Sequence, residues 1–250
     1  MKRSLAGAFA RIDRADGHIN ELKLLIERYR KSQEEKVIAD HHAVNRLLAI
    51  PPGQSFTERP RSKALIDFPL DAAVIVGEVI YNLRAALDYL VYELAWQDSG
   101  AEQHGTQFLI ENVPSDPKHP ERGFQPRSKT CLAGFHKHHI DAIENLQPYK
   151  GCAWTKTLRD ISNPDKHRQL TAIGGSMESI SRIESGISGS LNNRSGQILR
   201  GVGGSYTDTN IDLQYAIKVT LPDGTPIVET LEILKGKVAA TIDAFKPEFK

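Results

Sequence analysis

The sequence predicts an α+β fold: a helical core of two long packed helices plus shorter helices, with a mainly antiparallel β element in the C-terminal third. Apolar residues recur at intervals of three and four near the N-terminus and again within 69–96, which is the helical period. From Ile211 to Leu221 six apolar residues alternate with other residues, which is the period of a strand. We therefore divide the chain into a mainly helical part, 1–169, and a β-rich part that ends in a helix, 170–250.

The first predicted element is one long N-terminal helix that carries a heptad seam. Because the seam is sustained, this helix must pack against another one. After the polar stretch SQEEK at 32–36, the sequence predicts a strand or hairpin over 37–50. The seam consists of Leu5, Ala8, Ile12, Ala15, Ile19, Leu22, Ile26 and Tyr29.

The second predicted helix spans 69–96 and has two different sides. Its apolar arc consists of Val79, Ile80, Leu83, Leu87, Leu90, Val91 and Leu94. Outside that arc lie Asn82, Arg84, Asp88, Tyr89 and the tyrosines at 81 and 92. Arg84 and Asp88 are four residues apart and share a face, so they can form an ion pair. Since three exposed tyrosines would leave much apolar area in water, we expect another element to cover this side and enclose its polar groups.

The remaining elements are shorter. The density of Gly, Pro, His and Ser predicts a long excursion over 97–129, with a possible short strand in FLIENV at 108–113. Helical patterns follow over 138–146 and 154–161, and Asn163-Pro164 should stop the second. A C-terminal helix is predicted from Leu231, Leu234, Val238, Ile242 and Phe245.

Composition limits the function classes. With 250 residues, one domain with an appended element is expected, and a formal net charge of +1 gives no bulk electrostatic reason to bind nucleic acid or an acidic membrane. Cys131 and Cys152 are too few for a disulfide framework, which favours a cytoplasmic protein. The sequence contains no apolar run of about 20 residues, so a soluble protein is expected, and no cofactor motif is found.

The segment NPDKHR, residues 163–168, is the second polar cluster. Asp165, Lys166, His167 and Arg168 place an acid, two permanent cations and a titratable base in succession. One interpretation is a solvated turn after a helix end. The other is a site in which Lys166 and Arg168 hold a phosphate or carboxylate and His167 acts as acid and base.

A histidine-rich run, FHKHHID, offers His136, His138, His139 and Asp141, and two further histidines stand at 41–42. Neither HEXXH nor paired CXXC spacing is present, so we expect exposed histidines and no metal site. Stability should then be indifferent to chelators.

Three motifs occur in a fixed order: NLR-x-ALD-x at Asn82–Tyr89, LQPY at Leu146–Tyr149, and N-x-DKHR at Asn163–Arg168. Together they resemble a family of uncharacterised bacterial proteins over roughly the first 170 residues. The first motif is also similar to the helical HEPN superfamily, whose RNase members carry Arg and, four to six residues later, His, and cut RNA without metal across a dimer interface. Arg84 matches that arginine, whereas Tyr89 takes the place of the histidine and Ala85 that of a usual polar residue.

The resemblance implies a metal-independent, HEPN-like protein that binds or cleaves RNA through one polar pocket and forms a homodimer through helix packing. In this hypothesis Arg84, Lys166 and Arg168 hold phosphate, His167 moves the proton, Asn82 and Asp88 orient the other groups, and Tyr89 and Asp165 complete the pocket. The alternative is a non-catalytic binding or assembly module in which the same residues form a buried structural network. An open cleft would favour the first hypothesis and a sealed network the second.

Overall fold

The contacts in the computed structural model divide the chain into two units. The helical unit, as we name it, combines Met1–Lys23, Pro69–Ile173 and Leu221–Lys250, and the second unit combines Leu24–Phe68 with Gly174–Thr220. The structure describes the backbone of residues 3–47, 62–66, 69–166, 174–186, 198–200, 206–221 and 223–249. It describes the side chains of residues 3–33, 69–162, 219–221 and 223–249.

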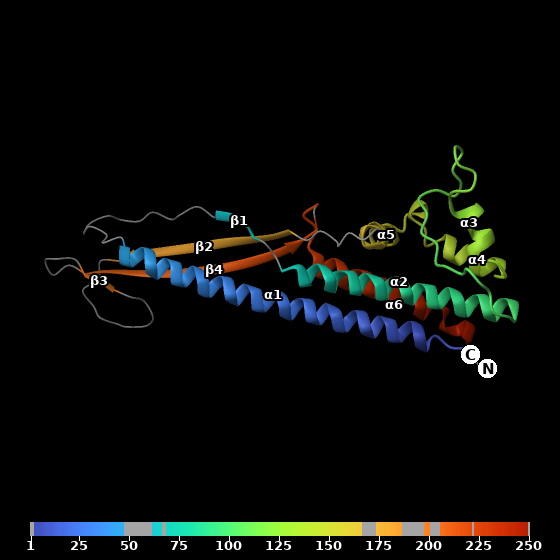
Figure 1. The fold of residues 1–250 in the computed structure, drawn as a ribbon, viewed down its shortest axis with the longest axis horizontal. Helices are drawn as coiled ribbons and strands as arrows, with labels where there is room; N and C mark the ends of the chain where they lie inside the picture. The colour runs from blue at the N-terminus through green and yellow to red at the C-terminus, as the bar shows by residue number, and fades with distance from the viewer. Residues whose placement is uncertain are drawn as a thin grey trace. The chain divides into compact units, whose positions relative to one another are not determined.

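Long helices make up most of the described chain (Figure 1). The helices are α1 (Ala6–Leu47), α2 (Leu70–Ser99), α3 (Phe124–Cys131), α4 (Lys137–Glu144), η1 (Pro148–Lys150), α5 (Ala153–Lys166), α6 (Ile227–Phe245) and η2 (Lys246–Phe249). The strands are β1 (Ser62–Ile66), β2 (Gly174–Gly186), β3 (Ile198–Arg200) and β4 (Tyr206–Thr220).

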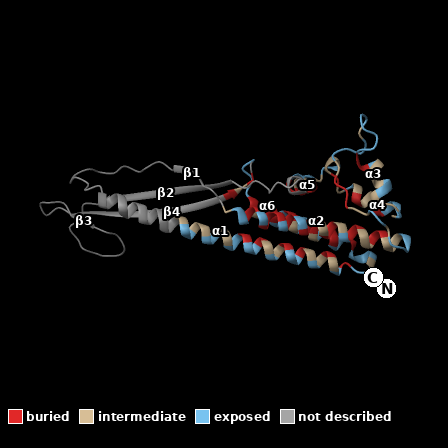
Figure 2. Cartoon of the chain, in the orientation of Figure 1, coloured by how far each residue is buried: buried red, intermediate tan, exposed pale blue. Residues whose placement is uncertain are grey.

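The core of the helical unit lies along α2, which contacts α5 and α6 and is buried over most of its length (Figure 2). Every residue of the predicted apolar arc of α2 is buried, and so are the predicted apolar positions of α6. From the N-terminal seam, which begins one residue before α1, the buried residues are Leu5, Ala8, Ile12, Ala15, Ile19 and Leu22. The helical periodicity therefore located the main core correctly.

Polar contacts fix how α1 packs along α2 within the helical unit. Arg3 Nε donates to Glu93 at 2.8 Å, and Arg11 Nη1 donates to Asn82 Oδ1 at 3.3 Å. Between them a Cβ added to Gly7 would lie 2.8 Å from Tyr89 Cδ1. Successive turns of α1 thus meet earlier and earlier turns of α2, which is an antiparallel arrangement.

The strands belong to the second unit and pair with one another in the antiparallel order β1-β2-β4-β3. The register aligns Ile66 with Gly175 and Gly174 with Thr220. None of these strands lies in the helical unit, whose described elements are all helices.

The α+β fold class expected from the sequence is therefore wrong, because the described chain is mostly helical and most of its buried core residues lie on helices. Alternating apolar residues indicate a strand locally, but an α+β fold requires a sheet and helices that share one core. The contacts also divide the chain differently from the expected segments 1–169 and 170–250, since each unit combines separated stretches.

Three local expectations are also corrected. The helix α1 continues through SQEEK and the expected strand at 37–50 as far as Leu47, where the described stretch ends. Residues 108–113 form no strand, although Phe108, Leu109 and Ile110 are buried. The helix α5 passes through Asn163-Pro164 and extends to Lys166.

Among the described residues, the structure contains no helix that is both long enough and apolar enough to cross a membrane.

Candidate functional site

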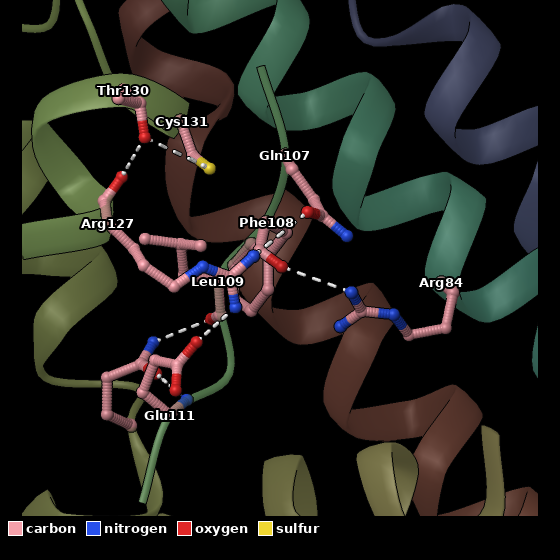
Figure 3. A network of polar contacts seen from close by, with 9 residues as sticks. Arg84, Gln107, Phe108, Leu109, Glu111, Arg127, Thr130 and Cys131 are labelled. Carbon is pink, nitrogen blue, oxygen red and sulfur yellow. Dashed lines mark hydrogen bonds and ion pairs between the residues drawn. The ribbon is translucent and has the colours of Figure 1, made fainter. Parts of the chain in front are cut away.

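An extended, buried segment at Phe108–Glu111 lies at the centre of the candidate site. Two side chains of α2 hold the backbone of Phe108. Arg84 Nη2 donates to its carbonyl oxygen at 3.1 Å (Figure 3). The N–H of Phe108 donates to Asp88 Oδ1 at 2.8 Å. In an extended chain the N–H and C=O of one residue point to the same side. The i,i+4 side chains of α2 therefore take the place of a neighbouring strand.

Gln147, from the LQPY motif, holds further backbone groups of the same segment. Its Nε2 donates to Leu109 O at 2.8 Å and to Ile143 O at 3.0 Å, and its Oε1 accepts the N–H of Glu111 at 2.7 Å. The Gln147 side chain is fully buried. Because buried backbone groups must find partners, these bonds explain how a segment outside any sheet is kept in the interior.

Arg84 has donors left over. The residue is 8% exposed, and its Nε and Nη1 find no hydrogen-bond partner among the described residues. Arg84 also borders a partly open cavity of about 160 Å³, which is lined by Arg84, Gln107, Phe108, Leu109, Ile110, Arg127, Arg159 and Ser162. A single water needs only roughly 10–15 Å³ of such space, so a polyatomic anion fits.

Three arginines from different elements meet at this cavity: Arg84 from α2, Arg127 from α3 and Arg159 from α5. Carboxylates accompany them, because Arg127 pairs with Glu111 and Arg159 Nη2 lies 2.8 Å from Asp160 Oδ1. Among the described residues, however, no carboxylate lines the cavity itself. The lining is therefore rich in cationic donors, and the carboxylates that accompany Arg127 and Arg159 lie outside it.

Electrostatics single out Arg84 within this set. Burial lowers the pKa of its guanidinium from the ordinary value; the nearby charge of Asp88 opposes this change, and the charge of Arg127 adds to it. A buried cation beside a second cation is costly unless an anion compensates it. An anion in the cavity would supply that compensation and the missing hydrogen-bond acceptors.

Arg84 and Asp88 thus lie on one enclosed side of α2, as the sequence predicts, but Asn82 and Tyr89 do not join them. Asn82 is buried against α1, where its Oδ1 accepts from Arg11. Tyr89 lies beside Gly7 and remains 41% exposed, and Tyr81 is 57% exposed. The expectation that the tyrosines are covered is wrong for these two, and Asn82 faces α1 and does not line the cavity.

The remaining predicted site residues lie outside the described side chains. Asp165 and Lys166 belong to the last turn of α5, of which only the backbone is described, and His167 and Arg168 follow the described part of α5. The predicted contact between NPDKHR and the NLRAALD helix stays a prediction for these four residues.

Sequence reasoning missed Arg127, Arg159 and Gln107, which stand in no recognisable motif. In Figure 3, Arg127 reaches toward Glu111 and Gln107 from α3. Gln147 belongs to the LQPY motif, which marked its position in the sequence. Its role could not be predicted, because its hydrogen-bond partners lie in a segment 36 to 38 residues earlier.

Comparisons with protein-family models, with curated proteins and with solved structures find no match for this chain. The resemblance to the HEPN superfamily therefore remains an expectation from the motifs.

Proposed function

We propose that this chain binds a phosphate group of RNA in the arginine cavity and does so without a metal. The observation that carries this proposal is buried Arg84, which lines the cavity together with Arg127 and Arg159 and has two nitrogens without a hydrogen-bond partner among the described residues. Guanidinium groups bind phosphate oxygens through planar, charge-assisted hydrogen bonds.

RNA is proposed as the carrier because the NLR-x-ALD-x motif resembles HEPN proteins. Bulk charge gives no support, since the net charge is +1. Attraction therefore has to be local, and the binding should recognise one phosphate group more than a long stretch of backbone.

Binding without cleavage fits the described residues better. Among them, no histidine and no carboxylate lines the cavity, so an acid and a base for proton transfer are missing there. The Asp88 carboxylate accepts the Phe108 N–H and is thus engaged in the structural network. Cleavage would need His167, whose position the structure does not describe.

The alternative hypothesis of a structural network also has a specific observation in its favour, namely the hold of Arg84 and Asp88 on Phe108. Both roles are compatible, because Arg84 uses Nη2 for the network and has Nε and Nη1 left for a ligand. A homodimer through the N-terminal seam is not part of the proposal, since its first six positions are already buried within a single chain.

The test compares three arginine variants. Arg127→Gln and Arg159→Gln each remove one cation from the cavity. Arg122→Gln is the control: it removes the same charge from a side chain of the preceding loop that is 66% exposed and does not line the cavity. Binding of single-stranded RNA with and without a 5′-phosphate is measured by fluorescence anisotropy in EDTA, with inorganic phosphate as competitor.

We expect the parent to bind RNA and inorganic phosphate to displace the RNA. RNA binding should be at least tenfold weaker in Arg127→Gln and Arg159→Gln and unchanged in Arg122→Gln. Phosphate binding without RNA binding would overturn the RNA carrier and keep the anion site. Equal affinities in all three variants would place the binding elsewhere and overturn both.

A further inference from the structure

A second cluster of polar groups lies in the helical unit where the end of α2, the start of α4 and η2 meet. It contains His136, His138 and His139 around α4, Asp98 from the last turn of α2, and Glu248 from η2. One ring nitrogen of each histidine lies within 4.8 Å of a ring nitrogen of the other two. We propose that these three histidines and Glu248 bind one Zn²⁺ ion.

Asp98 fixes which nitrogens are free. Its side chain is 2% exposed, and its Oδ2 lies 2.7 Å from His139 Nδ1, while its Oδ1 lies 3.2 Å from His136 Nδ1. A carboxylate only accepts hydrogen bonds, so Nδ1 of His139 carries the proton and its Nε2 is the nitrogen left for a ligand. A carboxylate that holds a histidine in this way is the usual partner behind a zinc ligand.

The lone pair on His139 Nε2 is the strongest sign of a missing cation. His139 is 3% exposed, and its Nε2 is buried without a hydrogen-bond partner among the described residues. Phe245 covers the ring from another side at 5.9 Å between ring centroids. A buried acceptor with no donor is costly, and bound metal would remove that cost.

The fourth ligand is already close to the required position. Glu248 Oε2 lies 3.6 Å from His139 Nε2, which is too long for a hydrogen bond. Two ligands of one tetrahedral Zn²⁺ lie about 3.3 Å apart, since each is about 2.0–2.2 Å from the metal. The separation therefore suits a bridging ion better than a direct bond.

Charge and access agree with this proposal. The nitrogen-rich set of three imidazoles and one carboxylate is typical of zinc among the common biological metals. His136 and His138 are exposed, so a metal ion can reach the buried nitrogen of His139 from solvent. The sequence expectation of exposed histidines is wrong for His139, and the proposal replaces the expectation that the run binds no metal.

A bound ion would fasten η2 to α2 and α4. Within the described residues, η2 is linked to α2 by Gln97 Nε2, which donates to the carbonyl of Glu248, and Glu248 Oε2 lies 3.6 Å from His139 Nε2 of α4. The site is therefore proposed as a structural one that stabilises the folded chain by binding it selectively.

The experiment uses the full chain without an affinity tag, stripped with EDTA and dialysed. Zn²⁺ binding is measured by competition with a chromogenic chelator, and Co²⁺ replaces Zn²⁺ to report coordination geometry by visible absorption. His138→Gln and Glu248→Gln each remove one ligand from an exposed position, and His119→Gln is the control, because its side chain is 50% exposed and lies outside the cluster. Circular dichroism checks that all variants fold.

We expect one equivalent of Zn²⁺, an intense tetrahedral Co²⁺ spectrum, and a metal-dependent rise in melting temperature. Affinity should fall at least tenfold in His138→Gln and in Glu248→Gln and stay unchanged in His119→Gln. Absence of stoichiometric binding in the parent overturns the proposal, as does binding that both ligand variants retain in full or that gives the weak spectrum of octahedral Co²⁺.

Discussion

Replacing Gln147 tests how the extended segment at Phe108–Glu111 is held. Gln147→Leu keeps a similar volume but removes every polar atom of the side chain. Two backbone groups then lose their partners, the carbonyl of Leu109 and the N–H of Glu111. The carbonyl of Ile143 loses one donor but still accepts the N–H of Leu146 at 3.1 Å. Water cannot replace Gln147 easily, because its side chain is fully buried.

The size of the effect follows from these two groups. Each buried backbone group that loses its partner costs about 1–3 kcal/mol, and the packing of the leucine offsets part of the sum. We expect Gln147→Leu to lower the free energy of unfolding by about 2–5 kcal/mol, a large share of the roughly 5–15 kcal/mol of a typical domain.

Urea denaturation followed by circular dichroism measures this change. The matched control is Gln125→Leu, which makes the same substitution at an exposed position of α3 and should change stability by less than about 0.5 kcal/mol. If Gln147→Leu and Gln125→Leu were equally stable, the bonds of Gln147 would contribute nothing and the structural role given to LQPY would be refuted.

Gln147→Glu adds a test with a definite sign. A carboxylate would face the carbonyl oxygens of Leu109 and Ile143, so the neutral acid is favoured in the folded chain and its pKa is raised above the unfolded value of about 4.3. Such a group contributes stability below the unfolded pKa and loses it as pH rises through the folded pKa. Gln147→Glu should therefore be more stable, relative to the parent, at pH about 4 than at pH about 7.5.

Three further predictions concern α1, the LQPY motif and α2. Gly17→Ala should stabilise the chain by about 0.5–1 kcal/mol in urea denaturation, because nothing described lies within 4 Å of the added methyl group. Gly7→Ala should show no such gain, because it would place the methyl group 2.8 Å from the Tyr89 ring. Equal gains in the two variants would contradict the packing of α1 on α2. The pKa of Tyr149 is raised by burial and then by the hydrogen bond from its hydroxyl to Glu144. The contribution of Tyr149 to stability is therefore present below pH about 10 and is lost at higher pH. Tyr149→Phe should lose less stability than the parent above that pH, and identical pH profiles of the two would argue against the raised pKa. Arg84→Ala should lower the free energy of unfolding by about 3–5 kcal/mol in a urea titration, because the Phe108 carbonyl loses its donor and Asp88 loses a nearby cation. A change below about 1 kcal/mol would show that Arg84 is not part of the structural network.

The parts of the fold that the sequence predicted are those governed by periodicity. The buried face of α2, the seam of α1 up to Leu22 and the buried side of α6 follow directly from apolar spacing. Spacing also placed Arg84 and Asp88 on one face. Each of these features depends on the geometry of a single helix, which local sequence determines.

The features that the sequence did not predict depend on partners far along the chain. Phe108 looked like the start of a strand, yet its backbone partners are side chains 20 and 24 residues earlier in α2. Similarly, His139 lies in a run that looks exposed, and it is buried because α2 and Phe245 cover it. No local pattern reports such contacts, and for the same reason Arg127 and Arg159 could not be linked to Arg84 from sequence.

A crystal structure of the chain grown with phosphate at neutral pH tests the anion cavity most directly. We expect electron density for one phosphate in the cavity, with an oxygen about 2.7–2.9 Å from Arg84 Nη1 or Nε. Arg127 or Arg159 should be a second donor to the same phosphate. The density should be absent from crystals of Arg159→Gln grown in the same solution. A cavity filled by a carboxylate of the chain itself, or by water alone at saturating phosphate, would contradict the account.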